Sequence, residues 1–262
     1  MNNNVLSAHR RFLPRLTTDE IRLIDKRRSL LVLPTGSVEQ HGPHLPVFTD
    51  SLINEKLVVG ALDLLPEEAD VWALPQLSYG KSNEHSGFSG VFTLSTAAYY
   101  AVLTDIIRSA ATDGWRRLLI VNSHGGNPEV IALAARDAKV DLNMDVFMIN
   151  TGGLYRHEDF PARENEFGIH GGALETSLML HIRPEWVRKE KYAAKYPAKA
   201  ENSLFQLAGD MIFAWKTSEL SASGAIGDPA LSGEKAGGDI YGRVTKRIAE
   251  AMLEALAWET KG

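Results

Sequence analysis

The chain has 262 residues and a formal net charge of -5, from 28 lysines and arginines against 33 aspartates and glutamates. This balance argues against nucleic acid as a partner, and the length suits one large α/β domain over residues 1–262. Cysteine is absent, so a disulfide framework is excluded and a zinc site would have to use histidines and carboxylates. No stretch has the apolar character of a signal peptide or a membrane span, so we expect a cytoplasmic protein with no membrane partner.

Apolar runs and amphipathic segments alternate along the chain. Thr17 and Glu20 have the spacing of a capping box, which predicts a helix that ends near Arg28. Further helices are expected at 50–65, at 95–112, from 127 onward, at 172–182 and at 233–259. Strands are expected at 29–34, 71–74, 118–121 and 146–149. This alternation predicts a three-layer α/β/α fold with a mostly parallel central sheet.

The loop after the first predicted strand is the most informative segment. It gathers four side chains that bind divalent metals well, Glu39, His41, His44 and Asp50. Open α/β sheets place their active sites at the carboxyl ends of the strands. A polar surface loop would explain any one of these residues, but loops seldom gather so much ligand chemistry. We therefore interpret the segment as part of a metal site.

A second polar segment follows the strand expected at 118–121. His124 stands where a parallel strand delivers a side chain to the same sheet edge, and Gly125 and Gly126 allow a ligand to approach the backbone. Alternatively, His124 lies in a surface turn and Asn127 caps the next helix. Because His124 leaves the same edge as the first loop, we favour a ligand role.

A third segment carries His170 and Glu175 at the start of a predicted helix. Glu175 could simply stabilise the positive end of that helix, or it could point into the site as a metal ligand or a base. His170 could shuttle a proton, or it could be a solvated loop histidine. Glu84 and His85, in a polar glycine-rich loop, could orient ligands from a second layer or be solvated.

Three carboxylates and two imidazoles exceed what a single tetrahedral zinc ion needs. The set consists of Glu39, His41, Asp50, His124 and Glu175. It suits two divalent ions roughly 3.5–4 Å apart with one carboxylate between them. Histidine and carboxylate ligands favour Zn, Mn or Fe. Two such ions would lower the pKa of a bridging water and polarise a substrate carbonyl, so the predicted cofactor is a pair of divalent metal ions.

The same segments resemble the sequence signature of the creatininase family. The resemblance rests on the runs 36–50, 123–127, 170–177 and 224–229, together with Glu234. It spans about residues 30 to 240. It implies a three-layer α/β/α fold, a binuclear metal centre and a homo-oligomer, which in this family is often a hexamer.

The resemblance also implies roles for individual residues. The family positions that match Glu39, His41, Asp50 and His124 bind metal, and the position of Asp50 bridges the two ions. The position that matches His170 serves as a proton shuttle in creatinine amidohydrolase. These roles are expectations for the present chain.

Two departures from creatinine amidohydrolase affect the expected chemistry. In that enzyme a Tyr-Glu pair follows the strand histidine and its Glu binds metal, whereas this chain has Gly125 and Gly126 there. Glu175 is therefore our candidate for the fifth ligand. Creatinine-specific members hold their flat substrate with tryptophans, whereas the loop at 152–168 has Tyr155 and phenylalanines but no tryptophan. This difference argues against creatinine as the substrate.

We therefore expect a metal-dependent hydrolase that opens a C–N bond in a small, cyclic amide. His170, with Glu175 where it is not a ligand, would deliver a proton to the leaving group. The substrate would contact His85, Gly125, Gly126 and Tyr155. One alternative is a cyclic ketone or lactone, such as an inositol-derived keto sugar, opened at a C–C or C–O bond. Another is a metal-dependent binding protein without turnover.

Overall fold

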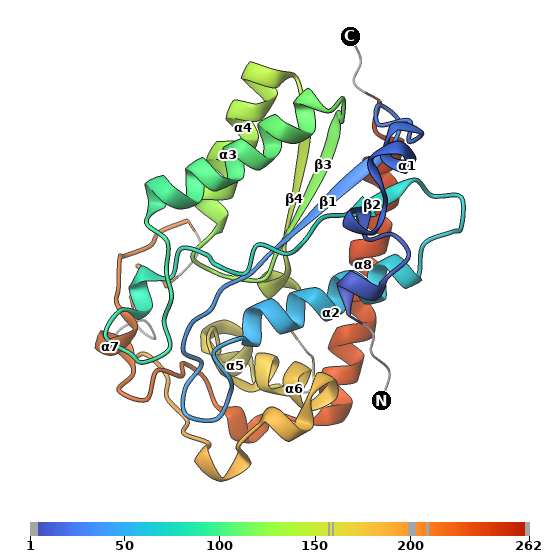
Figure 1. Cartoon of the computed structure of the whole chain (residues 1–262). Coiled ribbons are helices and arrows are strands. Elements are labelled where there is room, and N and C mark those ends of the chain that lie inside the picture. Colours follow the sequence, from blue (N-terminus) through green and yellow to red (C-terminus); the bar gives the residue numbers. More distant parts are fainter. Residues whose placement is uncertain (1–4, 157, 159, 199–202, 208–209, 260–262) are drawn as a thin grey trace.

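The computed structural model describes residues 5–156, 158, 160–198, 203–207 and 210–259. Its sheet has four parallel strands in the order β2-β1-β3-β4. They are β1 (Leu30–Thr35), β2 (Val71–Ala73), β3 (Arg117–Asn122) and β4 (Asp145–Asn150). Because all four run in one direction, their carboxyl ends share one edge of the sheet (Figure 1).

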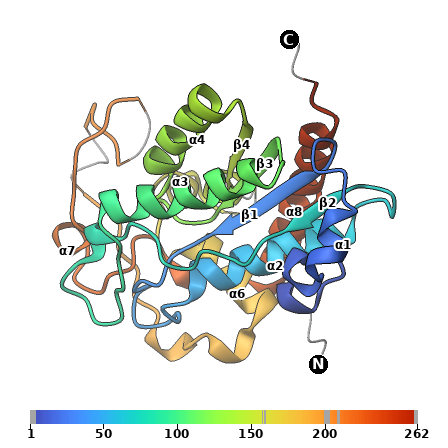
Figure 2. The same cartoon turned by 45° about the horizontal axis from the view of Figure 1, so that its top comes forward.

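Helices cover both faces of this sheet. Their bounds are α1 (Thr18–Arg22), α2 (Thr49–Asp63), α3 (Thr96–Thr112), α4 (Pro128–Leu142), α5 (Ala162–Phe167), α6 (Ala173–Ile182), α7 (Thr217–Leu220) and α8 (Glu234–Ala257). Figures 1 and 2 show α3 and α4 on one side of the strands and α2, α6 and α8 on the other. The predicted three-layer α/β/α fold is confirmed.

The uninterrupted apolar strands follow from this layering. In β1, Leu30 and Val32 pack against the layer of α2, α6 and α8, whereas Leu31 and Leu33 pack against the layer of α3 and α4. A parallel strand covered on both faces needs apolar residues at every position. The central strands therefore bury both faces, and their carboxyl ends carry the polar residues Thr35 and Asn122.

Two local predictions differ from the structure. The capping box between Thr17 and Glu20 is present, but the helix ends at Arg22 rather than near Arg28. A turn replaces the expected last part of that helix, because the carbonyl of Asp25 accepts hydrogen bonds from the amides of Arg28 and Ser29. The segment 152–168, expected to be irregular, contains the short helix α5, and its residues 157 and 159 lie outside the described part.

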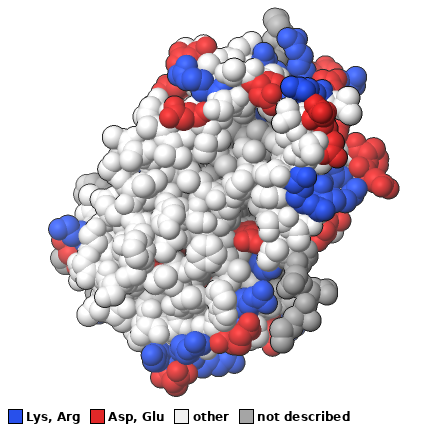
Figure 3. Space-filling model, viewed as in Figure 1, with Lys and Arg blue, Asp and Glu red and all other residues white. Residues whose placement is uncertain are grey.

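The surface carries mixed charge. On the face shown in Figure 3, lysines and arginines lie among aspartates and glutamates near the rim, and a broad central area is uncharged. This face presents no continuous basic patch of the kind that binds a phosphate backbone. None of the helices described has the combined length and apolarity needed to cross a membrane.

Candidate metal centre

Five side chains from four segments converge at the carboxyl edge of the sheet. Glu39 and His41 lie in the loop after β1, and Asp50 lies in the first turn of α2. His124 follows β3, and Glu175 lies in the first turn of α6. Glu175 is partly buried and the other four are buried. The structure thus brings together all five residues that the sequence predicts as metal ligands.

Asp50 lies between two imidazoles. One carboxylate oxygen, Oδ1, is 3.1 Å from His41 Nε2, and the other, Oδ2, is 3.1 Å from His124 Nδ1. The hydroxyl of Ser37 donates a hydrogen bond of 2.6 Å to Oδ2. The two oxygens of one fixed carboxylate therefore face two different histidines, which is the arrangement of a group that can bridge two ions.

Glu39 is the most deeply buried acid of the cluster, with 1% of its surface exposed. Its Oε2 lies 3.2 Å from His124 Nδ1 and accepts no hydrogen bond from a described residue. Its Oε1 lies 3.4 Å from His85 Nε2 and 3.7 Å from His170 Nδ1. A buried carboxylate oxygen without a hydrogen bond is costly unless a cation satisfies it.

Backbone carbonyls fix which nitrogen of each histidine faces the cluster. His41 Nδ1 lies 3.1 Å from the carbonyl of Glu39, and His124 Nε2 lies 2.9 Å from the carbonyl of Lys81. A carbonyl oxygen only accepts hydrogen bonds, so these nitrogens carry the protons in the neutral rings. His41 Nε2 and His124 Nδ1 therefore turn their lone pairs toward Asp50, as metal-binding histidines do.

The charges of the cluster favour bound cations. Burial lowers the pKa of His41, but Asp50, Glu175 and Glu39 outweigh this effect and raise it to about 10. Burial also lowers the pKa of His124, yet Glu39 and Asp50 hold it well above its ordinary value. In the metal-free cluster, protons on the two imidazoles thus balance the carboxylates, and a divalent ion would replace them.

Among the residues that the structure describes, three overlapping sets of ligand atoms lie close enough to hold an ion, with all atoms of a set within 4.8 Å of one another. The sets are Glu39, His41 and His170; Glu39, Glu84 and His124; and His41, Asp50 and Glu175. Their chemistry is that of imidazole and carboxylate, which suits Zn, Mn or Fe. The residues present therefore fit the predicted metal ions.

Glu175 combines the two roles that the sequence left open. Its Oε2 accepts a hydrogen bond of 2.6 Å from the amide of Gly171 just before α6, and the same oxygen lies 3.8 Å from His41 Nε2. Burial raises the pKa of this carboxyl to about 7, against the opposing charge of His41. The side chain therefore satisfies a backbone amide near the helix start and faces the cluster as well.

His170 is buried rather than solvated, with 6% of its surface exposed. Its ring lies between those of His41 and His85, with ring centroids 4.2 Å away on each side. Its Nε2 lies 2.6 Å from the carbonyl of Gln40, so the neutral ring turns Nδ1 toward Glu39. An imidazole held in this way can accept or deliver a proton at the site.

Two residues that contact the histidines of the site, Gln40 and Thr217, were not predicted from the sequence. Gln40 accepts a hydrogen bond from the amide of Gly42 through Oε1, and its Nε2 lies 2.9 Å from His85 Nδ1. The hydroxyl of Thr217 also lies 2.9 Å from His85 Nδ1. The place of Gln40 between two predicted ligands could have drawn attention to it, whereas nothing in the sequence around Thr217 does so.

Two residues of the predicted motifs lie elsewhere. His44 points away from the cluster, with Nε2 3.1 Å from the hydroxyl of Thr176 and its ring against Tyr192. Asn127 precedes α4 but makes no side-chain capping bond. The side-chain nitrogen Nδ2 of Asn127 donates instead to the carbonyl of Gly36, and this hydrogen bond fixes the loop after β1.

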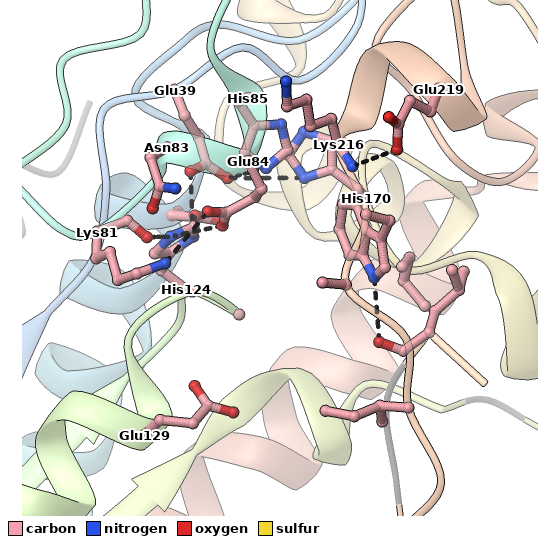
Figure 4. Close-up of a pocket in the computed structure, with 18 of the residues that line it drawn as sticks. Glu39, Lys81, Asn83, Glu84, His85, His124, Glu129, His170, Lys216 and Glu219 are labelled. Carbon is pink, nitrogen blue, oxygen red and sulfur yellow. Dashed lines mark hydrogen bonds and ion pairs between the residues drawn. The ribbon is translucent and has the colours of Figure 1, made fainter. Parts of the chain in front are cut away.

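A cavity of about 670 Å³ opens over the cluster, and we call it the first chamber. Glu39, His85, His124 and His170 lie along its wall (Figure 4). Glu175, Gly125 and Gly126 line it as well. A second chamber of about 590 Å³ adjoins the first, and His124 and Glu175 line both. Tyr155 lines this second chamber, where its hydroxyl pairs with that of Thr151 at 2.6 Å.

The sequence of this chain matches the family described as creatinine amidohydrolase over residues 14–252. The chain belongs to the creatininase family. A mycofactocin precursor peptide peptidase of Mycolicibacterium smegmatis is 29% identical to it over 258 residues, which cover 95% of both chains. A creatinine amidohydrolase of Pseudomonas putida is 34% identical over 190 residues, or 64% of this chain and 70% of the relative.

Solved structures agree with this membership at the level of the fold. A putative creatinine amidohydrolase from Bacteroides fragilis superposes on the whole of this chain with a TM-score of 0.80 at 22% identity. The superposition covers all of that chain as well. As a creatininase family member with relatives named as a peptidase and an amidohydrolase, the protein is a hydrolase.

Proposed function

We propose that this creatininase family member hydrolyses an amide C–N bond with the help of two divalent metal ions. Five residues would hold the ions: Glu39, His41, Asp50, His124 and Glu175. The observation that carries the proposal is the position of Asp50, whose two oxygens face His41 and His124 at 3.1 Å each. The buried Oε2 of Glu39, which accepts no hydrogen bond from a described residue and faces His124, supports a cation on the His124 side.

The metals and the protein would divide the chemistry between them. Bound divalent ions supply a Lewis acid and lower the pKa of water at the site. Hydrolysis joins the oxygen of a water to the carbonyl carbon, breaks the C–N bond and leaves a proton for the departing nitrogen. His170 would move that proton through Nδ1, because the carbonyl of Gln40 holds its other nitrogen.

Relatives support both the bond and the metals. The names of the Mycolicibacterium peptidase and the Pseudomonas amidohydrolase describe enzymes that cleave amide bonds. One similar solved structure is described as a mutant creatininase of the Zn-Zn type and another as creatininase Mn, with TM-scores of 0.76 and 0.74. Zn or Mn is therefore the metal we propose, in agreement with the histidine and carboxylate ligands.

A second candidate keeps the metal centre and changes the bond. A 3-dehydro-scyllo-inosose hydrolase of Thermotoga maritima is 25% identical to this chain over 182 residues. The same cluster could open a cyclic ketone or a lactone at a C–C or C–O bond. Release of acid from a nitrogen-free ring would then replace release of an amine.

A substrate panel separates the two candidates. The purified chain is loaded with Mn or Zn and incubated with linear amides, cyclic amides, lactones and cyclic keto sugars. Release of ammonia, amine or formate from an amide, lost after chelation and restored by metal, is the expected result. Equal amide hydrolysis by chelated and metal-loaded protein would refute the proposal, and ligand binding without any product would favour a binding protein.

We further propose that the protein forms a homo-oligomer, such as a hexamer, and acts on its substrate in the cytoplasm. Val47, Tyr79 and Phe92 are exposed apolar side chains in the loops after β1 and β2. Backbone hydrogen bonds join these loops. The amide of Phe92 donates to the carbonyl of Val38, and the amide of Glu39 donates to the carbonyl of Val47. Light scattering during size-exclusion chromatography tests the oligomer, and a monomer would refute it.

A further inference from the structure

Glu164 is a buried carboxylate that stands apart from the metal cluster. It lies in α5 with 0% of its surface exposed. It belongs to none of the three ligand sets described above and lines neither chamber. A buried carboxylate costs free energy unless hydrogen bonds or a cation satisfy it. The partners of Glu164 therefore show what this side chain does in the fold.

Three donors from three segments satisfy the Glu164 carboxylate. Its Oε1 accepts a hydrogen bond of 2.6 Å from the amide of Ala173, the first residue of α6. Its Oε2 accepts one of 2.7 Å from the hydroxyl of Tyr196 and one of 2.9 Å from the amide of Asp228. A negative charge is also favourable at the start of a helix. Glu164 thus joins α5 to the start of α6 and to two later segments.

Glu164 fixes both ends of the connection between α5 and α6, residues 168–173. At the first end, the amide of Gly168 donates a hydrogen bond of 2.8 Å to the backbone carbonyl of Glu164. At the other end, the amide of Ala173 donates to the side chain of Glu164. His170 lies in the middle of this connection. The residue proposed to move the proton is therefore held between two attachments to Glu164.

The same carboxylate fixes the segment that pairs with His170. The amide of His170 donates a hydrogen bond of 3.1 Å to the carbonyl of Ile226, and the amide of Ile226 donates one of 2.6 Å in return. Asp228, whose amide donates to Glu164 Oε2, lies just after this pair. A shift between the two segments would move His170 Nδ1 from its place 3.7 Å from Glu39 Oε1.

Glycines surround this carboxylate. A Cβ atom would lie 2.5 Å from Glu164 Oε1 at Gly172 and 2.9 Å from it at Gly227, and closer still at Gly168. Because real Cβ atoms do not approach so closely, Glu164 fills the space that side chains at these positions would need. Close packing of this kind leaves the carboxylate and the segments around it little freedom to move.

We propose that Glu164 is a positioning residue for the hydrolysis and fixes His170 where its Nδ1 can move the proton. The proposal rests on the role proposed for His170. The three hydrogen bonds of the carboxylate go to none of the proposed metal ligands, so Glu164 would act through His170 rather than through the ions. Glu164→Gln should release the connection, because in either orientation the NH2 group of the amide faces a backbone N–H donor.

The test is a double-mutant cycle in the full, metal-loaded chain, with the amide that is hydrolysed fastest in the panel above. Glu164→Gln is made in the wild type and in His170→Ala, and kcat and metal content are measured on each preparation. Tyr196→Phe, which removes one hydrogen bond and leaves the carboxylate, is the milder second variant. Glu190→Gln makes the same change at an exposed site outside both chambers and serves as the control.

Glu164→Gln should keep its metal and lower kcat at least about tenfold in the wild type, yet lower it no further in His170→Ala, where no imidazole is left to position. Tyr196→Phe should show the same pattern with a smaller loss, and it decides the proposal if Glu164→Gln does not fold. Glu190→Gln should leave kcat unchanged. An equal loss in both backgrounds would make Glu164 merely structural, and an unchanged kcat would also overturn the proposal.

Hydrogen exchange separates this proposal from the proposed function. If the metal-loaded protein hydrolyses no amide, the proposed function fails, and exchange of the backbone amides still decides whether Glu164 positions His170. In Glu164→Gln, the amides of 168–173 and 226–228 should exchange at least about tenfold faster than in the wild type, while those of β1 and β3 keep their rates. Unchanged exchange around His170, or faster exchange over the whole chain, would overturn the proposal.

Discussion

Glu84 occupies the space that a side chain at position 126 would need. A Cβ atom on Gly126 would lie 2.5 Å from Glu84 Oε1 and closer still to the carbonyl of Lys81. His124 Nε2 lies 2.9 Å from the same carbonyl and 3.7 Å from Glu84 Oε1. Glycine at this position thus lets the loop with Lys81 and Glu84 reach His124 Nε2.

Gly126→Ala should destabilise the protein and weaken its metal site. The added methyl group would push the 81–84 loop away from His124 at a cost of about 1–3 kcal/mol. Gly125→Ala is the matched control for stability, because the space beside Gly125 is open. Urea unfolding of the two metal-loaded variants measures the difference. Equal midpoints would show that the loop yields without cost.

Glu39→Gln and His124→Ala should each lower metal affinity by at least about 100-fold and reduce activity in proportion. His124 faces Asp50, and Glu39 carries a buried oxygen that accepts no hydrogen bond from a described residue. Glu129→Gln is the control, because this exposed carboxylate lies in the same cavity but belongs to none of the ligand sets. Competition with a chelator gives the affinities. Unchanged affinity in Glu39→Gln would remove that residue from the coordination shell.

His170→Ala should keep its metal and lose kcat by a factor of about 10²–10⁴, the usual contribution of a general acid or base. His170 belongs to one candidate ligand set with Glu39 and His41, but it lies outside the Asp50 pair, so its loss would leave the five proposed ligands in place. Metal content and kcat are measured on the same preparation. Loss of metal would instead make His170 a ligand.

Metal affinity should rise with pH. The pKa of His41 in the metal-free cluster is about 10, so this ring holds a proton at neutral pH that metal binding must release. At any pH below this pKa, the proton on His41 competes with the metal ion. For each proton that metal binding releases, the metal affinity therefore rises about tenfold per pH unit. Chelator competition with Mn at pH 6.5, 7.5 and 8.5 checks this slope. Affinity independent of pH would contradict the proton balance inferred for the cluster.

The sequence was sufficient for the fold and the position of the cluster because both depend on local patterns. Apolar runs marked the strands, and polar residues just after two of them had to meet at one sheet edge. Asp50, at the start of the helix expected at 50–65, lies in the first turn of α2.

The rest depends on contacts between distant segments. His44 shares the motif of His41, yet a glycine at φ +70°, Gly42, turns it toward Thr176 instead. Thr217 reaches His85 across 132 residues, and Trp215, which lines the first chamber, comes from the same late part of the chain. No periodic pattern in the sequence predicts such contacts between distant segments, because the intervening loops are fixed only by the packed fold.

The most direct test of the central claim is the metal content per chain, by elemental analysis of protein purified without added metal, followed by amide hydrolysis on the same sample. We predict about two divalent ions per chain and activity that disappears on chelation and returns with Zn or Mn. A chain that contains no metal, takes up none and still hydrolyses an amide would contradict the account.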